Sequence, residues 1–167
     1  MNRNPNLNLA TGNNFQLVFS QLPFDDETPK DFVLHVYETV LPGISFSEDI
    51  QSWQGWDLKS IVSNLNFNNW TINFDVDENF SNWIKIFDWM NHINNNKDKA
   101  GNSLKNYCID SSLVIYDNYG KSILKFNFSN MFPLDLGDII LSYRQGDVYL
   151  TSTSTFVYTN YQIDKNI

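Results

Sequence analysis

Few residues in this chain of 167 have side chains suited to catalysis, and their spacing does not group them. Cys108 is the one cysteine, and a thiol nucleophile needs a neighbouring base such as histidine. The two histidines, His35 and His92, fall in a candidate strand and a candidate helix, and their spacing does not indicate a zinc site. A lone cysteine is more often a small buried apolar residue. We therefore expect no catalytic residue, no metal and no cofactor.

Acidic residues form two patterns that could do chemistry. Asp25-Asp26-Glu27 could supply the two carboxylates of a glycosidase, but it falls in a segment typical of a solvated loop. Asp75-x-Asp77-x-Asn79 begins like a calcium-binding loop. Phe80, however, stands where that loop needs glycine, and Ile86 stands where it needs its last glutamate. Neither pattern is complete, and we predict that the protein is not an enzyme.

The charge balance limits the possible partners. The chain carries 11 Lys plus Arg against 19 Asp plus Glu, a net charge of −8, without a basic cluster. Since nucleic-acid binding depends on cations that displace counterions from phosphates, this surface is not expected to bind DNA. Apolar runs end within about ten residues, whereas a membrane helix needs about 20, so no membrane anchor is expected. The polar first residues and the single cysteine predict a reducing compartment.

The N-terminal part has an arm and two candidate strands. Residues 1–13 are mostly polar, with Leu7 and Leu9 to bury, which predicts an N-terminal arm without a core of its own. Apolar residues repeat at period two over 15–19, and residues 32–37 are a second candidate strand.

Residues 43–64 show no clean periodicity, which predicts a long loop. Trp53 and Trp56 stand in it among polar residues. Two interpretations are open: the tryptophans cover the core of their own domain, or they anchor a partner, because tryptophan is enriched in interface hot spots.

A strand and a helix are predicted in the middle of the chain. The parity of apolar residues changes at Asn68-Asn69, which indicates a bulge or turn before a strand. Asp77 suits a helix N-cap, and the apolar spacing that follows predicts one helix over about residues 78–93. Its apolar stripe is expected to comprise Phe80, Trp83, Ile84, Phe87 and Met90, widened by Ile86, Trp89 and Ile93. A polar loop over 94–106 follows.

The last third is predicted to be strands and turns. One pair of strands flanks a turn at 117–120, and a second pair, 138–143 and 148–161, flanks a turn at 144–147. Ser and Thr occupy both faces of the final segment, which is typical of a strand that lines water. The whole chain, 1–167, is thus predicted to be a single mainly β (α+β) domain, a two-sheet β-sandwich or barrel with one flanking helix.

Short segments across residues 14–161 follow a recognisable order. They are Asn14-Phe15-Gln16-Leu17-Val18, Leu41-Pro42-Gly43-Ile44, Trp70-Thr71-Ile72-Asn73-Phe74-Asp75-Val76-Asp77-Glu78, Ile84-Lys85-Ile86-Phe87-Asp88-Trp89, Met131-Phe132-Pro133-Leu134-Asp135-Leu136-Gly137 and Phe156-Val157-Tyr158-Thr159-Asn160-Tyr161. In this order they resemble the tail tube proteins of contractile-tailed (myovirus-type) bacteriophages, which are structurally related to the type VI secretion tube protein. Residues 45–64 and the polar loop after the helix depart from the family pattern.

The resemblance implies a structural virion protein. Family members form hexameric rings in which sheets join edge to edge around a lumen, and the rings stack into the inner tail tube, the conduit for DNA ejection. A lumen of like charge would let DNA pass without specific binding. The resemblance also implies partners among tail sheath and baseplate proteins, assembly in the host cytoplasm and a final place in the phage tail. Leu7, Leu9, Trp53 and Trp56 are the expected contacts to the next ring.

Two other functions are open. Within the same class, a tube-like baseplate initiator or a tail terminator ring would share the fold but occupy one end of the tube. In a different class, a monomeric β-sandwich would bind carbohydrate or another small ligand through exposed aromatic side chains. Rings or stacked tubes would favour the first class, and a stable monomer that binds sugar would favour the second.

Overall fold

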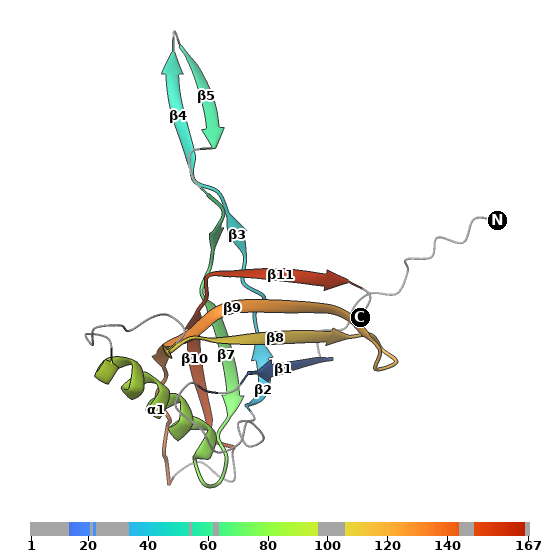
Figure 1. Cartoon of the computed structure of the whole chain (residues 1–167), viewed down its shortest axis with the longest axis vertical. Helices are drawn as coiled ribbons and strands as arrows, with labels where there is room; N and C mark the ends of the chain where they lie inside the picture. The colour runs from blue at the N-terminus through green and yellow to red at the C-terminus, as the bar shows by residue number, and fades with distance from the viewer. Residues whose placement is uncertain are drawn as a thin grey trace, which may run out of the picture.

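The computed structural model describes residues 14–20, 22, 34–53, 55–61, 64–96, 106–143 and 149–165, which form antiparallel strands and one helix (Figure 1). The elements are β1 (Phe15–Phe19), β2 (His35–Thr39), β3 (Ile44–Ser45), β4 (Glu48–Trp53), β5 (Trp56–Ile61), β6 (Asn66–Phe67), β7 (Trp70–Asp75), α1 (Ser81–Asn96), β8 (Ile109–Tyr116), β9 (Ser122–Leu136), β10 (Thr151–Val157) and β11 (Asn160–Lys165). The predicted mainly β fold with one helix is confirmed for these residues.

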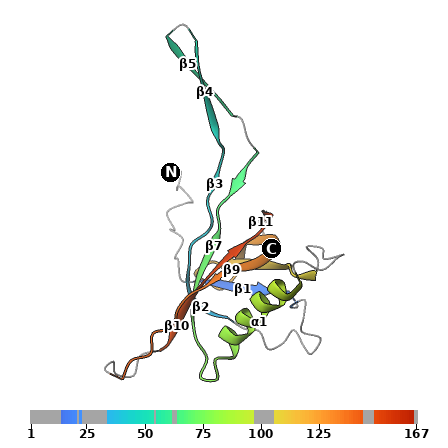
Figure 2. The ribbon, with the colours of Figure 1, turned by 90° about the vertical axis from the view of Figure 1, so that its left-hand side faces the viewer.

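Two sheets share one long strand. The strand order is β1-β8-β9-β10-β7-β2, and β11 also pairs with β9. Residues 124–129 of β9 pair with β11, whereas residues 132–136 pair with β10. Between these two parts Asn130 adopts a positive φ, a left-handed conformation that asparagine adopts more readily than most residues. β9 thus passes from one sheet into the other, and the two sheets cross (Figures 1 and 2).

Aromatic side chains from both sheets and the helix fill the core. The Trp70 indole of β7 stacks on the Phe128 ring of β9, with centroids 4.1 Å apart and ring planes 14° apart. Trp89 of α1 lies 6.1 Å from Phe156 of β10, measured between ring centroids. All four side chains are fully buried. Because they come from four different elements, this cluster fixes the sheets and the helix relative to one another.

Several predicted strands are confirmed. β1 covers the predicted residues 15–19, and β7 buries its even-numbered residues, as its sequence parity predicts. The break predicted at Asn68-Asn69 separates β6 from β7. The turn predicted at 117–120 joins β8 to β9, and the Asp117 carboxylate accepts two backbone N–H groups there.

The helix begins later than predicted, at Ser81 rather than near residue 78. Phe80 has a positive φ, and its N–H donates to the Asp77 carbonyl at 2.9 Å, so a turn precedes the helix. Asp77 still caps it from outside: its carboxylate accepts the Asn82 N–H at 3.2 Å and the Ser81 hydroxyl. Asp77 therefore supplies a capping hydrogen bond, but the N-cap position is Phe80, whose carbonyl accepts the Ile84 N–H, and the predicted helix boundary is wrong.

The buried face of α1 differs from the predicted stripe. Asn82, Ile86 and Trp89 are the buried residues, whereas Ile84 and Phe87 are nearly half exposed. The Asn82 side chain donates to the Asp75 carbonyl at 2.8 Å, which fixes the rotation of the helix as it leaves β7. Apolar residues occupy most of the circumference of this helix, so their spacing alone does not show which side of the helix packs on the sheet.

The predicted long loop over 43–64 is wrong. This segment holds β3 and the hairpin of β4 and β5, which turns at Gly55, where a positive φ favours glycine. Ser52 Oγ donates to Asp57 Oδ1 at 2.6 Å across the two strands. The described side chains of β4 and β5 are all exposed, so neither face had to be apolar, and the alternation on which strand prediction depends is missing.

The predicted final hairpin is also wrong. Residues 138–143 are not a strand, and β10 pairs with residues 132–136 of β9 and with β7. The predicted strand over 148–161 is divided into β10 and β11. Ser152 and Ser154 are buried rather than facing water, because their hydroxyls donate to the carbonyls of Gly137 at 3.0 Å and Asp135 at 2.9 Å. A buried hydroxyl is tolerated when it has such a partner.

Parts of the predictions lie outside the described residues. These are the N-terminal arm (1–13) with Leu7 and Leu9, the acidic residues 25–27, the turn at 144–147 and residues 97–105 of the predicted polar loop. The first residues of that loop, 94–96, belong to α1 instead.

Thr39→Val should destabilise the fold although valine has nearly the same shape. The Thr39 hydroxyl accepts the buried indole N–H of Trp70 at 2.7 Å and donates to the Thr71 carbonyl at 3.1 Å. Valine would leave that N–H unpaired, which costs about 1–3 kcal/mol. Urea unfolding followed by tryptophan fluorescence measures the loss. Thr155→Val, on the solvent side of β10, should change stability by less than about 0.5 kcal/mol; equal losses in both variants would contradict this role of Thr39.

Candidate assembly surfaces

Hydrophilic side chains cover the face of β2, β7 and β10 that points away from the core. The strand register defines this face, since Asn73 stands opposite Thr153 on one side and Glu38 on the other. Thr155 likewise stands opposite Thr71 and Asp135. We call this surface the polar strip; it comprises His35, Glu38, Thr71, Asn73, Asp75, Asp135, Thr151, Thr153 and Thr155.

Hydrogen bonds join the polar strip across three strands. Thr153 Oγ1 donates to Asn73 Oδ1 at 2.7 Å, and Asn73 Nδ2 donates to Glu38 Oε2 at 2.8 Å. The Thr71 and Thr155 hydroxyls lie 3.5 Å apart. Because five of its side chains bond one another, this part of the strip is an ordered surface.

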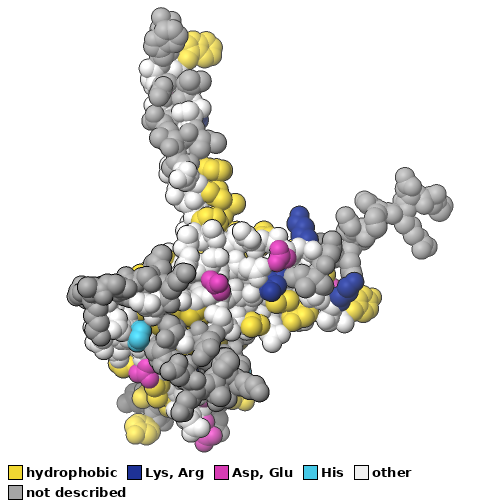
Figure 3. Space-filling view, viewed as in Figure 1, with side chains coloured by type: hydrophobic (Ala, Val, Ile, Leu, Met, Phe, Trp, Pro, Cys, Tyr) yellow, Lys and Arg dark blue, Asp and Glu magenta, His cyan; other side chains and the backbone are white. Residues whose placement is uncertain are grey.

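The polar strip is acidic. It carries three carboxylates, Glu38, Asp75 and Asp135, and no Lys or Arg. The five lysines in the described part of the chain are Lys59, Lys85, Lys121, Lys125 and Lys165. Of these, the last three belong to the β8-β9-β11 sheet and its turn, and Figure 3 shows basic side chains on that side of the molecule.

Residues 44–67, which we call the arm, project away from the two sheets (Figures 1 and 2). Within the described residues, β4 and β5 pair only with each other. The arm exposes large apolar side chains: Phe46 and Ile50 are more than half exposed, and Trp56 is 82% exposed. An isolated two-stranded hairpin is only marginally stable in water, so the arm gains stability when another surface covers it.

The base of the arm is anchored on the body. The Tyr158 hydroxyl donates to the Asn68 carbonyl at 2.8 Å, and the Asn68 N–H donates to the Gly43 carbonyl at 3.1 Å. The Phe67 ring packs edge-on against Tyr158 and Tyr161, at centroid distances of 6.0 and 5.3 Å. A Cβ on Gly43 would lie 3.3 Å from Asn68 Nδ2, a tight contact. The Leu-Pro-Gly segment thus positions the arm.

The opposite end of the molecule also exposes apolar side chains. The connection from β9 to β10 lies beyond the last residue of β7, because the Val76 N–H donates to the Leu150 carbonyl at 2.7 Å. Four side chains of this connection are between 72% and 110% exposed, and we call them the end patch: Ile140, Leu141, Tyr143 and Tyr149. Figure 3 shows hydrophobic side chains on the arm and at this lower end.

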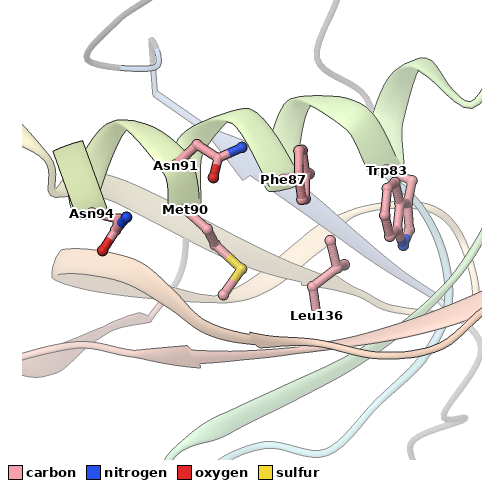
Figure 4. Close-up of a pocket in the computed structure, with 6 residues that line it drawn as sticks. All are labelled: Trp83, Phe87, Met90, Asn91, Asn94 and Leu136. Carbon is pink, nitrogen blue, oxygen red and sulfur yellow. The ribbon is translucent and has the colours of Figure 1, made fainter.

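A groove of about 420 Å³ lies between α1 and the end of β9 (Figure 4). Trp83, Phe87, Met90, Asn91, Asn94 and Leu136 line it. The Trp83 and Phe87 rings stack with centroids 5.7 Å apart, and Trp83 Nε1 is buried without a hydrogen-bond partner. The lining is largely apolar, so polar groups do not converge in it as they do in a typical small-molecule site.

Little in the described structure supports catalysis. No three His, Cys, Asp or Glu side chains in the described ranges are placed to hold a metal ion. Burial, and secondarily the Asp110 carboxylate, raises the pKa of the Cys108 thiol to about 11, which disfavours the nucleophilic thiolate. Across the same ranges, α1 is too short and too polar to cross a membrane.

Of the four residues predicted to contact the next ring, the structure describes the positions of Trp53 and Trp56, whereas Leu7 and Leu9 lie outside the described residues. Trp53 and Trp56 lie opposite each other at the tip of the arm, and the Trp56 side chain does not cover the core. Of the two interpretations of this tryptophan, the core interpretation is therefore wrong. The sequence does not predict the end patch: it places Ile139-Ile140-Leu141 in a strand, although this run of three apolar residues lacks the alternation of a half-buried strand.

A family model matches most of the chain. The sequence model described as "Phage tail tube protein" matches residues 6–164. The tail tube terminator protein of Enterobacteria phage T4 is 30% identical over 97 residues, which cover 57% of this chain and 55% of that protein. The match thus spans about half the length of this curated relative.

Solved structures share the fold at low sequence identity. A chain of the anti-feeding prophage baseplate, 6-fold symmetrised, is 8% identical, with a TM-score of 0.68 and coverage of 95% of this chain and 97% of the other. A chain of the PVC sheath/tube terminator in the extended state is 15% identical, with a TM-score of 0.66 and coverage of 94% and 97%.

An Hcp protein shares the fold as well. The Hcp1 protein from E. coli EAEC 042, in a mutant form, is 6% identical, with a TM-score of 0.53 and coverage of 91% of this chain and 98% of the other. The resemblance inferred from the sequence, to phage tail tubes and to type VI tubes, is therefore confirmed.

Cys108 should react slowly with iodoacetamide. Its thiol has a pKa of about 11. The thiolate fraction at pH 8 is then about 100-fold below that of an ordinary thiol, and the native alkylation rate should fall accordingly. Mass spectrometry of timed samples measures the rate, with a short cysteine peptide as reference. In urea the difference should disappear, and rapid labelling of the native protein would contradict the buried, neutral thiol.

Proposed function

The chain belongs to the phage tail tube protein family, and from this we propose that it is a subunit of stacked hexameric rings that form the inner tube of a contractile tail. Members of this family are structural components of phage tails. In the proposed role the protein does no catalysis; it forms the wall of a conduit and resists load through its contacts with other subunits.

The proposal is supported mainly by one sheet, whose aromatic face packs on the core of the subunit and whose polar face points away from it. Both edges of this sheet are unpaired in the described chain. β2 pairs there only with β7, and residues 132–136 of β9 pair only with β10. Unpaired edges invite further pairing, and a closed ring satisfies them without leading to aggregation. In such a ring the polar strip would face the lumen, with the aromatic core and α1 outside it.

The charge of the polar strip suits the passage of DNA. Glu38, Asp75 and Asp135 would place carboxylates on the lumen wall in every subunit, and the described strip offers no lysine or arginine to hold a phosphate. Like charge keeps the DNA away from the wall, so it can slide without specific binding. Sheath and baseplate proteins would then contact the outside and the end of the tube, after assembly in the host cytoplasm.

A tail terminator ring is the second candidate. It is favoured by the T4 relative, a tail tube terminator, although the match covers only 55% of that protein. A terminator would use the same ring and polar strip but would close one end of the tube. The two functions differ in one property, since tube rings stack on copies of themselves and a terminator ring stacks on a different protein.

Purified protein should form six-fold rings and, with rising concentration, stacks of rings. Negative-stain electron microscopy shows their symmetry, and light scattering of the same sample gives the mass. Rings that never stack would favour the terminator. A monomer at every concentration that binds oligosaccharide would contradict both functions and support the ligand-binding alternative.

A gold label should locate the polar strip at the lumen. In a Cys108→Ser background, Thr71→Cys places a thiol on the strip and Asp88→Cys places one on the exposed side of α1. After labelling with a small maleimide gold cluster, averaged images of rings should show density at the centre for Thr71→Cys and at the periphery for Asp88→Cys. The reverse arrangement would show that the strip faces outward.

A further inference from the structure

The groove between α1 and β9 has a chemistry that limits what can bind in it (Figure 4). Its lining side chains are uncharged. The buried indole N–H of Trp83 has no acceptor among the described residues, which is unfavourable until a carbonyl or a similar group reaches it. Phe87, which stacks on Trp83, is 46% exposed. The groove therefore suits an uncharged, apolar segment of chain that brings a hydrogen-bond acceptor.

The groove lies beside a sheet edge that the proposed ring would close. Leu136, one of its lining residues, ends β9, and residues 132–136 of β9 pair only with β10 in the described chain. β2 forms the other edge of this sheet. Each strand from β9 through β10 and β7 to β2 runs antiparallel to its neighbour, so β2 of one copy can pair antiparallel with β9 of the next. In such a ring, every groove lies beside a neighbouring copy.

The start of β1 is far from the middle of α1 in the same copy. Phe15 pairs with Ile115, near the end of β8, whereas the Trp89 indole of α1 donates to the carbonyl of Tyr107, two residues before β8. Because β8 has eight residues, these two points lie roughly 26 Å apart. Figure 1 likewise shows α1 and the start of β1 on opposite sides of the molecule.

β1 starts instead on the side of the molecule that carries β2. Leu17 of β1 and Val36 of β2 pack on one apolar cluster, and Figures 1 and 2 both show the two strands side by side. Ile86 of α1 belongs to the same cluster, so β1 and α1 both lie on the core-facing side of the sheet that carries the polar strip. In a ring, the start of β1 in one copy therefore points toward the groove of the next copy.

The residues before β1 match this groove in reach and in chemistry. Leu9 stands five residues before Asn14 and reaches at most roughly 18 Å from it, too short for the middle of its own α1. Residues 4–13 contain no charged side chain. Leu7 and Leu9 alternate with asparagine, so an extended chain places both leucines on one side. Its backbone carbonyls recur at every residue and can accept the Trp83 N–H.

We propose that residues 6–10 of one copy bind in the groove between α1 and β9 of the neighbouring copy in the same ring. This contact rests on the proposed function, because the ring brings the two surfaces together. Leu7 and Leu9 then contact the same ring rather than the next one. Each copy gives one segment and receives one, a heterologous contact that closes on itself when the ring is complete. The segment stabilises each seam of the ring on the side away from the lumen.

A disulfide experiment tests the contact directly. In a Cys108→Ser background, Leu9→Cys is combined in one chain with Asn91→Cys, an exposed position in the groove lining. Single rings are isolated by size-exclusion chromatography and oxidised under mild conditions. Non-reducing electrophoresis should then show a ladder of linked chains that ends at the hexamer. The control combines Leu9→Cys with Asp88→Cys, which is exposed on the same helix outside the groove lining, and should give no ladder.

Four results would overturn the proposal while leaving the ring in place. Intact rings without a ladder would do so, and a disulfide within one chain would show that the segment returns to its own groove. A ladder that forms only in stacked rings would place the contact between rings. If the Asn91→Cys thiol reacts with maleimide as fast in rings as in monomers, the groove is open to another protein, such as sheath. Absence of rings altogether would contradict the proposed function, and this contact with it.

Ring stability gives an independent readout. Leu7→Ser with Leu9→Ser should raise the concentration at which rings dissociate by about 10-fold or more, whereas the matched control, Asn6→Ser with Asn8→Ser, should change it by less than about 2-fold. Phe87→Ser in the groove should weaken the rings as well, and adding it to the two leucine changes should have little further effect, because the partners are already separated. Analytical ultracentrifugation measures dissociation, and thermal melts of the monomers check the fold. Fully additive losses would contradict the contact.

Discussion

The stack of Trp70 on Phe128 holds the two sheets of this molecule together, with ring centroids 4.1 Å apart. One ring comes from β7 and the other from β9, the strand that runs through both sheets. Because the Trp70 indole N–H is also paired, with the Thr39 hydroxyl, the contact orients the edge strand β2 as well as the sheets. The arm, the polar strip and the end patch all take their positions from strands that meet at this core.

The polar strip shows how one strand serves two environments. β7 places Trp70, Ile72 and Phe74 on the inner face and Thr71, Asn73 and Asp75 on the outer face, and β10 turns Phe156 inward and three threonines outward. Ser152 and Ser154 stand on the inner face of β10, where backbone carbonyls satisfy their hydroxyls and allow burial. The hydrophobic core can therefore lie directly behind a surface that is suited to water.

The two ends of the molecule differ, and this difference would matter for a subunit of a tube. The Leu-Pro-Gly segment and the aromatic cluster of Phe67, Tyr158 and Tyr161 hold the base of the arm on the body. The arm can then extend away from the sheets (Figure 2). A tube that transmits force needs polarity and repeated contacts, and a subunit with unlike ends supplies both. The same geometry serves a terminator, which needs one of its ends to match the tube.

Local sequence determined the elements that bury one face. Period-two alternation predicts β1 and β7, the change of parity at Asn68-Asn69 marks the break before β7, and Asp77 caps the helix. Sequence order across these elements was also enough to indicate the family.

The arm could not be predicted, because strands exposed on both faces have no apolar periodicity. Nor could the burial of Ser152 and Ser154, the separation of β10 from β11, or the face of α1 that meets the sheet, since each depends on partners distant in sequence. Only the tertiary structure places Trp56 and Leu141 at opposite ends, because that separation is set by β7 and by the strands that pair with it.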